Sequence, residues 1–311
     1  MAEFSILLVF VLVLVLFAEF VNGATDAPNA IATVVATRAL SPFQAVAMAA
    51  VLNALGAMSG TAVAATIGKD IVSPDVVNLA TIAAAMVAII FWSGLAWRFG
   101  IPTSESHALV AGLTGAALAT SGPEALLWEG WYKVLLGLFF STFLGFGGGL
   151  LIMRLVTRFF RHVSASKGSS SFRNLQLLSS AFMAFSHGSN DGQKFIGTFT
   201  LALVLGGVLP EFAVPWWVIF VCSGVMAVGT ALGGWRIVQT MGMKMVRLKT
   251  HQGFAAETAA ATTIVVASGL GIPLSTTHTI STAIVGVGAA SRSSAVRWGV
   301  VSDIVYAWLL T

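Results

Sequence analysis

Two short polar stretches carry residue types that could bind ions within an otherwise apolar sequence. Residues 22–30 read Asn-Gly-Ala-Thr-Asp-Ala-Pro-Asn-Ala, and residues 187–195 read His-Gly-Ser-Asn-Asp-Gly-Gln-Lys-Phe. Aligning the two stretches places Asp26 on Asp191. An ionisable residue at membrane depth is costly, and such residues mark functional sites by default. We therefore predict that both stretches belong to a binding site and that each interrupts a membrane helix.

A second pair of motifs combines proline with hydroxyl side chains. Residues 100–107 read Gly-Ile-Pro-Thr-Ser-Glu-Ser-His, and residues 271–278 read Gly-Ile-Pro-Leu-Ser-Thr-Thr-His. In each motif the proline should end one helix, and a serine or threonine should cap the next. The apolar segments that follow, 107–120 and 277–290, are too short for a span of roughly 20 residues. Each is predicted to be half of a re-entrant hairpin, with its N-terminus open to a small tetrahedral anion.

The composition places these motifs in a membrane protein. The chain has 311 residues, of which 57% are hydrophobic and 9% are charged, against about 25% charged residues in a soluble domain. Period-2 alternation, which is typical of outer-membrane barrels, is absent. The net charge of +4 reflects loop asymmetry and does not predict nucleic-acid binding. The sequence predicts an all-α polytopic protein of the cytoplasmic (inner) membrane.

The apolar segments form two groups of five around a polar stretch. The first group is 4–40, 43–68, 76–99, 107–120 and 131–153, and the second is 174–209, 215–240, 254–270, 277–290 and 295–311. Breaks are expected at 22–30 and 187–194. Because five is odd, two similar halves must have opposite topology, and inverted repeats with broken helices are typical of secondary transporters. The motif 60–63 (Gly-Thr-Ala-Val) recurs as 229–232 (Gly-Thr-Ala-Leu).

We therefore divide the chain into repeat 1 (1–153), a basic loop (154–173) and repeat 2 (174–311). The loop contains several arginines and Lys167, which places it in the cytoplasm by the positive-inside rule. A regulatory partner could dock on this loop. The last apolar segment is short for a span and contains Asp303, which leaves open whether the C-terminus is complete.

The doubled motifs resemble the inorganic phosphate transporter family, often called PiT. The family signature is of the type Gly-Ala-Asn-Asp-x-Ala-Asn-Ala, and residues 23–30 match it with Thr25 in place of the first Asn. Residues 188–195 match Gly-x-Asn-Asp and then depart at Gln193 and Lys194. The resemblance covers nearly the whole chain. It implies inverted repeats, phosphate uptake coupled to a cation, and a homodimer.

Two departures from the family pattern affect the coupling ion. Lys194 aligns with Asn29, and an ammonium group, unlike an amide carbonyl, cannot ligate sodium. We hypothesise that Lys194 replaces a bound cation, either by pairing with Asp191 or by contacting phosphate, which favours proton coupling. Glu105 is a carboxylate among hydroxyl groups. It could take the coupling proton or face the cytoplasmic mouth, and the sequence leaves both interpretations open.

The resemblance and these departures together nominate the site residues. Those expected to bind phosphate are Ser104, Ser106, Asn190, Lys194, Ser275, Thr276 and Thr277. Those expected to bind the coupling cation are Asp26, Asn29, Glu105 and Asp191, with Na⁺ as the alternative to H⁺ at Asp26, Asn29 and Asp191. No resident metal and no cofactor are expected.

The expected function is secondary symport of inorganic phosphate by alternating access. Sulfate transport is the alternative in substrate, but phosphate retains protons that it can donate to Asp26 and Asp191. An anion channel is the alternative in class, although a channel needs a continuous pore. No nucleophile elbow, metal-binding helix or P-loop is found, so neither an enzyme nor an ATP-driven pump is expected.

Overall fold

The computed structural model describes residues 5–161 and 165–311, and these residues are almost entirely helical. Two isolated antiparallel bridges, Val72 with Leu126 and Val246 with Val296, are the only β pairing in this part of the chain. The predicted all-α class is confirmed. The side chain of Lys167 lies outside the described residues.

The order of elements in the first half of the chain recurs in the second half. The first half contains α1 (Ile6–Ala36), α2 (Pro42–Ala57), α3 (Ala62–Ala65), η1 (Thr66–Asp70), α4 (Leu79–Phe99), α5 (Glu105–Ser121), η2 (Pro123–Ala125) and α6 (Trp128–Phe160). The second half contains α7 (Ala165–Leu205), α8 (Trp216–Thr230), α9 (Trp235–Gln239), η3 (Thr240–Lys244), α10 (Thr250–Gly269), α11 (Thr276–Ser291), η4 (Ser293–Ala295) and α12 (Trp298–Leu310). Even the local helix types match, because η1 and η3 are π-helical while η2 and η4 are 3₁₀ turns.

Several helices are long and apolar enough to cross a membrane. Among the described residues these are α1, α4 and α6, or five spans if each bent pair counts as one. The bent pairs are α2 with α3–η1, at 65°, and α8 with α9–η3, at 61°. The ten apolar segments of the sequence yield fewer candidate spans because some helices, such as α5 and α11, are short and α7 carries the polar stretch.

The predicted breaks at 22–30 and 187–194 are wrong, because α1 and α7 run through them as continuous helices. The glycines there permit close helix crossing instead. A β-carbon on Gly188 would lie 2.0 Å from the backbone oxygen of Asn53 in α2, and one on Gly23 would lie 2.5 Å from that of Met226 in α8. The chain breaks instead at the ends of α2 and α8, beside the motifs 60–63 and 229–232.

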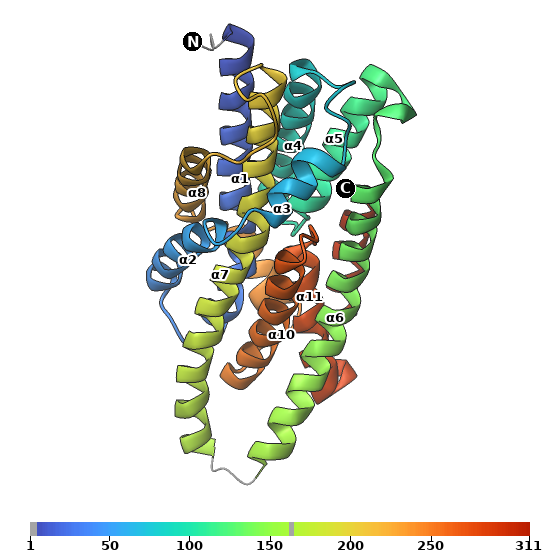
Figure 1. Ribbon diagram of the computed structural model, residues 1–311. Helices are drawn as coiled ribbons and strands as arrows, with labels where there is room; N and C mark the ends of the chain where they lie inside the picture. The colour runs from blue at the N-terminus through green and yellow to red at the C-terminus, as the bar shows by residue number, and fades with distance from the viewer. Residues whose placement is uncertain (1–4, 162–164) are drawn as a thin grey trace.

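The basic stretch 154–173 is also more regular than a loop. Helix α6 continues to Phe160, and α7 begins at Ala165. The positive residues of the stretch therefore lie on the ends of two long helices. The two helices approach each other at the bottom of Figure 1, at the end of the molecule opposite the N-terminus.

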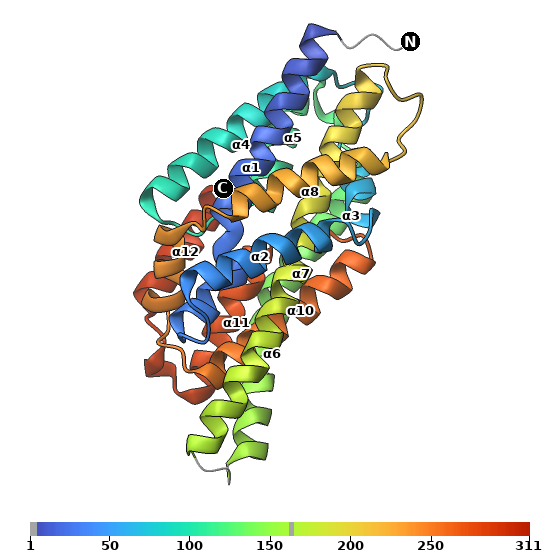
Figure 2. The same ribbon diagram turned by 90° about the vertical axis from the view of Figure 1, so that its left-hand side faces the viewer.

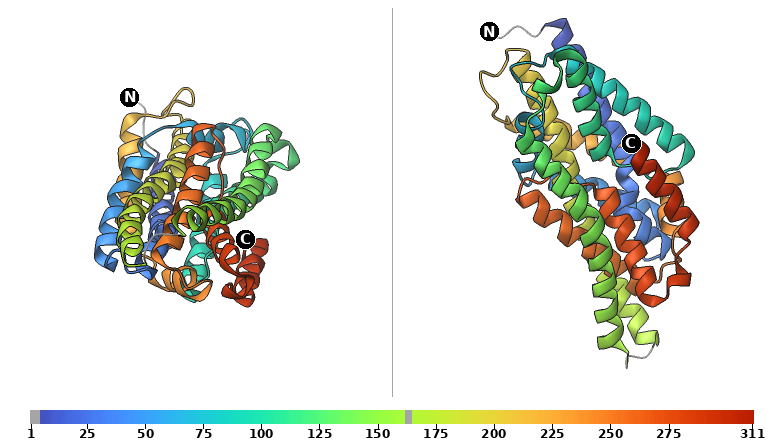
Figure 3. Two further views of the ribbon diagram at one scale, coloured as in Figure 1. Left: turned by 90° about the horizontal axis from the view of Figure 1, so that it is seen from below. Right: turned by 90° about the vertical axis from the view of Figure 1, so that its right-hand side faces the viewer.

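Two helical hairpins occupy opposite ends of the molecule. The α4–α5 pair lies in the upper half of Figure 1, with the N-terminus, and the α10–α11 pair lies in the lower half. Figure 2 and the right-hand view of Figure 3 show the same separation from other sides. Each hairpin has its own buried apolar core, one including Leu109 and Phe199 and the other including Ile264 and Ile280.

Helices α1 and α7 connect these two cores, and both are polar where they pass between them. In α1, residues 8–18 contribute to the first core and residues 30–34 to the second. In α7, residues 183–184 belong to the second core and residues 195–203 to the first. The polar stretches predicted to form a site thus lie at the junction of the two cores.

Candidate functional site

The hairpin turns bring hydroxyl groups to this junction. We call residues 100–107 the first tip and residues 271–278 the second tip. Gly100 and Gly271 share a left-handed φ of 68°, which glycine adopts without strain. Ser104 caps α5 by accepting a hydrogen bond from the His107 amide (3.2 Å), and Ser275 caps α11 by accepting one from His278 (3.1 Å). The predicted serine caps are confirmed.

Lys194 joins α7 to both tips. Its ammonium group pairs with Asp191 one turn away and donates to the Ser106 hydroxyl of the first tip. It also donates to the Leu274 carbonyl of the second tip at 2.9 Å. The side chains of Lys194 and Asp191 are 2% and 1% exposed. Of the two alternatives considered for Lys194, the structure shows the pairing with Asp191, while contact with phosphate stays a prediction. The ammonium group lies where the two tips meet.

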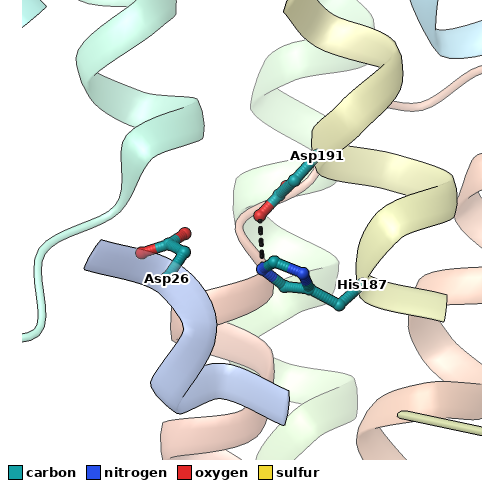
Figure 4. Close-up of side chains that lie close together, drawn as sticks. All are labelled: Asp26, His187 and Asp191. Atoms are coloured by element: carbon teal, nitrogen blue, oxygen red, sulfur yellow. Dashed lines mark ion pairs between the residues drawn. The ribbon is translucent and has the colours of Figure 1, made fainter. Parts of the chain in front are cut away.

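The second carboxylate oxygen of Asp191 has partners of its own. Oδ2 accepts a hydrogen bond from the Thr276 hydroxyl at 2.7 Å, and His187 Nε2 lies 3.0 Å from the same oxygen (Figure 4). The other ring nitrogen, Nδ1, lies 3.1 Å from Asn53 Oδ1. If Nδ1 donates to that amide oxygen, Nε2 is an acceptor that faces another acceptor, and it makes no hydrogen bond with any described residue until a proton is added. The Asp191–His187 contact is therefore a place where a proton can be held.

The α1 stretch reaches the second tip. Asn29 donates to the hydroxyls of Thr276 (3.2 Å) and Thr277 (2.9 Å), and Thr277 lies 3.4 Å from Asp26 Oδ2. Thr276 therefore contacts both Asn29 and Asp191. Thr276 and Thr277, at the N-terminus of α11, therefore bring Asp26 and Asn29 of α1 close to Asp191 of α7, the residue that aligns with Asp26 in sequence.

Glu105 of the first tip is buried beside this cluster. It is 2% exposed and accepts hydrogen bonds from Thr25 (2.9 Å) and Ser93 (2.6 Å). The interpretation that Glu105 faces the cytoplasmic mouth is wrong, because its carboxylate points inward to α1 and α4. Its suggested role as a proton acceptor stays a prediction.

Asn190 supports the second tip with its side chain. Its amide donates to Ser268 (3.0 Å) and to the Ile272 carbonyl (3.2 Å), while its oxygen accepts from the Leu274 amide (3.3 Å). All of its contacts hold the turn between α10 and α11. Ser104 and Ser275 have a similar positioning role as caps.

Three of the buried groups could share an ion. Ligand atoms of Asp26, His187 and Asp191 all lie within 4.8 Å of one another. Figure 4 shows the three side chains together. Both oxygens of Asp191 contact donors, among them the Lys194 ammonium group, whereas Asp26 accepts a long hydrogen bond from Thr277 (3.4 Å) and lies beside the Asp191 carboxyl group. Asp26 is therefore a more available ligand for a cation than Asp191.

A cavity of about 140 Å³ lies beside the two tips. Ser106 and His107 of the first tip and residues 273–275 of the second line one wall. The other wall is formed by apolar side chains of α5 and α6, including Val110, Trp131 and Leu138. The cavity therefore borders the first turn of both α5 and α11.

His187 and Thr25 lie in the two stretches predicted to form the site, but neither is among the predicted phosphate or cation ligands, and Ser93 lies in no motif. His187 precedes Asp191 by four residues, the spacing at which side chains meet on one helix face. The assumption of a broken helix at 187–194 concealed this signal. No sequence signal links Ser93 or Thr25 to Glu105, because these contacts form between separate helices.

Comparisons with known proteins agree with this architecture. A sequence model described as the phosphate transporter family matches residues 22–311. A probable low-affinity inorganic phosphate transporter of Rhizobium meliloti (strain 1021) is 45% identical over 98% of this chain and 92% of the relative. The protein of the same description from Bacillus subtilis (strain 168) is 38% identical over 98% and 93%.

A solved structure described as "The sodium-dependent phosphate transporter" has a similar fold. The TM-score is 0.81 at 25% sequence identity, and the match covers 98% of this chain and 95% of that one.

Proposed function

Since the chain belongs to the phosphate transporter family, we propose that it carries inorganic phosphate across a membrane by cation-coupled symport. The observation that carries this proposal is the meeting of two capped helix N-termini at one buried ammonium group, Lys194. Helix N-termini bind anions through free amide groups and the helix dipole. Ser106, Thr276 and Thr277 add hydroxyl donors at the same place.

Phosphate would bind between the two tips by taking over hydrogen bonds that the protein now makes with itself. The donors are Lys194 Nζ and the hydroxyls of Ser106, Thr276 and Thr277. Asp26 and Asp191 could accept hydrogen bonds from the protons of phosphate, which fully ionised sulfate does not carry. This chemistry favours phosphate over sulfate as the substrate.

Charge balance supports cation coupling. The carboxylates of Glu19, Asp26, Glu105 and Asp191 are each at most 3% exposed, and Lys194 is the buried ammonium group that interacts with them. A buried charge without a counter-charge costs several kcal/mol. An incoming phosphate adds further negative charge, so protons or metal cations must enter with it.

Lys194 favours protons as the coupling ion. Its ammonium group already pairs with the Asp191 carboxylate, so this carboxylate is not free to bind a sodium ion. The structural neighbour is described as sodium-dependent, which keeps Na⁺ as the alternative, with Asp26 and Asn29 as its ligands.

Alternating access would follow from two inverted repeats, 1–153 and 174–311, with re-entrant hairpins. The repeated element order, the matching left-handed glycines and the hairpins at opposite ends of the molecule (Figure 1) support this topology. Inverted repeats place the substrate site near the midplane, between the repeats.

The test is uptake of labelled phosphate into proteoliposomes, with a proton gradient and a sodium gradient imposed separately, for wild type and Asp26→Asn. Saturable uptake driven by the proton gradient and lost in Asp26→Asn is expected. Uptake driven by sodium alone would refute the role given to Lys194. Uptake of sulfate in place of phosphate would refute the substrate, and non-saturable flux without a gradient would indicate a channel.

A further inference from the structure

Helix α1 carries a continuous buried polar stripe that extends beyond the site. Its members are Glu19, Asn22, Asp26, Asn29 and Thr33, each at most 3% exposed. They recur every three or four residues, which places them on one face of the helix. The stripe begins about two turns before Asp26, toward the end of the molecule where the N-terminus lies (Figure 1).

Glu19, at the start of this stripe, has an incomplete set of hydrogen bonds. Its Oε2 accepts a hydrogen bond from Asn22 Nδ2 at 2.9 Å. Its Oε1 and the Oδ1 of Asn22 have no hydrogen-bond partner among the described residues, although both side chains are 0% exposed. A buried polar atom left without a partner costs about 1–3 kcal/mol, and more when it is charged. A positive charge, either a proton or a metal cation, would satisfy these two acceptor oxygens, as would a buried water molecule.

The groups that face Glu19 from neighbouring helices supply no such charge. Asp191 and Lys194 of α7 and Glu105 of α5 interact with it electrostatically, and Cys222 faces it from α8. Lys194 is held by Asp191, Ser106 and Leu274. The nearby carboxylates make an ionised Glu19 less favourable still. A proton needs one acceptor oxygen, whereas a metal ion needs several, so the proton fits this place better.

We propose that Glu19 is a proton-binding site, separate from the residues that surround Lys194 and Asp191 at the two tips. It takes up a coupling proton from the N-terminal end of the molecule. The proton adds to the carboxylate of Glu19 from water and leaves it again as the carrier turns over. Thr25 lies about one turn along α1 from Asn22 and donates a hydrogen bond to Glu105 at 2.9 Å. Glu105 is therefore the next carboxylate from Glu19 toward the two tips. By the positive-inside rule this end faces away from the cytoplasm, where uptake begins. The inference rests on the proposed proton-coupled transport.

Glu19→Gln tests this inference, because it keeps the shape and the acceptor for Asn22 but cannot take up a proton. Proteoliposomes are assayed for phosphate–phosphate exchange, which needs no net proton movement, and for accumulation driven by an imposed pH gradient. One pH unit corresponds to about tenfold in accumulation per coupled proton. Glu19→Gln is expected to retain exchange and to lose about tenfold in accumulation per pH unit. Glu124→Gln, which removes an exposed carboxylate, should match wild type.

Glu19→Asp keeps a titratable group and separates a chemical role from a packing role. It is expected to retain accumulation driven by the pH gradient. Equal accumulation by Glu19→Gln and wild type would overturn the inference, as would parallel losses of exchange and accumulation in both Glu19 variants. Absence of phosphate uptake by wild type would instead refute the proposed function. Accumulation that follows sodium alone in wild type would overturn the assignment of a proton to Glu19.

Discussion

Removing the charge of Lys194 should destabilise the protein strongly, because it leaves Asp191 buried without its ammonium partner. The side chains of Lys194 and Asp191 are 2% and 1% exposed, and the ammonium group also donates to Ser106 and to the Leu274 carbonyl. Breaking a buried pair by removing one partner costs about 3–5 kcal/mol. Since each 1.4 kcal/mol is about tenfold in an equilibrium constant, Lys194→Met should raise the ratio of unfolded to folded protein by roughly two to four orders of magnitude.

The measurement is equilibrium unfolding in mixed micelles for Lys194→Met, Asp191→Asn and the double variant. The double variant should be more stable than the sum of the single losses predicts, because it leaves no unpaired buried charge. Lys133→Met is the matched control. Its partner Asp70 lies at 2.8 Å, but the two side chains are 27–30% exposed, so its loss should cost at most about 1 kcal/mol. Equal losses for Lys133→Met and Lys194→Met, or additive effects in the cycle, would refute the reasoning.

Two further predictions concern packing and capping. Gly188→Ala places a β-carbon 2.0 Å from the Asn53 backbone oxygen and should lower the thermal unfolding midpoint. The control Gly224→Ala has nothing within 4 Å of its β-carbon and should leave the midpoint unchanged or raise it. An unchanged midpoint in Gly188→Ala would contradict the close crossing of α2 and α7. Ser275→Ala removes the acceptor for the His278 amide and should cost about 1 kcal/mol of unfolding free energy. Ser275→Thr keeps a hydroxyl acceptor without adding a buried charge and should lose less stability; equal losses in the two variants would argue against a capping role.

The parts of the fold that depend on local sequence were predictable. Membrane class, helical content and the caps at Ser104 and Ser275 follow from composition and from the proline–serine motifs. These features need no knowledge of which helices touch. The alignment of Asp26 with Asp191 likewise pointed to two side chains that lie close together in the structure.

The parts that depend on contacts between helices were not predictable. Glycine and proline at residues 22–30 suggested a break, yet Gly23 accommodates α8 and the helix continues around Pro28. The bends lie beside the less polar motifs 60–63 and 229–232. The same assumption of broken helices hid His187, and the burial of Glu105 depends on Thr25 and Ser93, which no spacing in the sequence connects to it.

The central claim is that phosphate binds between the two hairpin tips, at Lys194. Its most direct test is a crystal structure with arsenate, a tetrahedral analogue of phosphate whose anomalous scattering locates it. We predict an anomalous peak within hydrogen-bond distance of Lys194 Nζ and the Thr276 hydroxyl, lost in Lys194→Met. A peak elsewhere, such as the basic pocket formed by Lys244, Arg247 and Arg297, with none between the tips, would contradict the account.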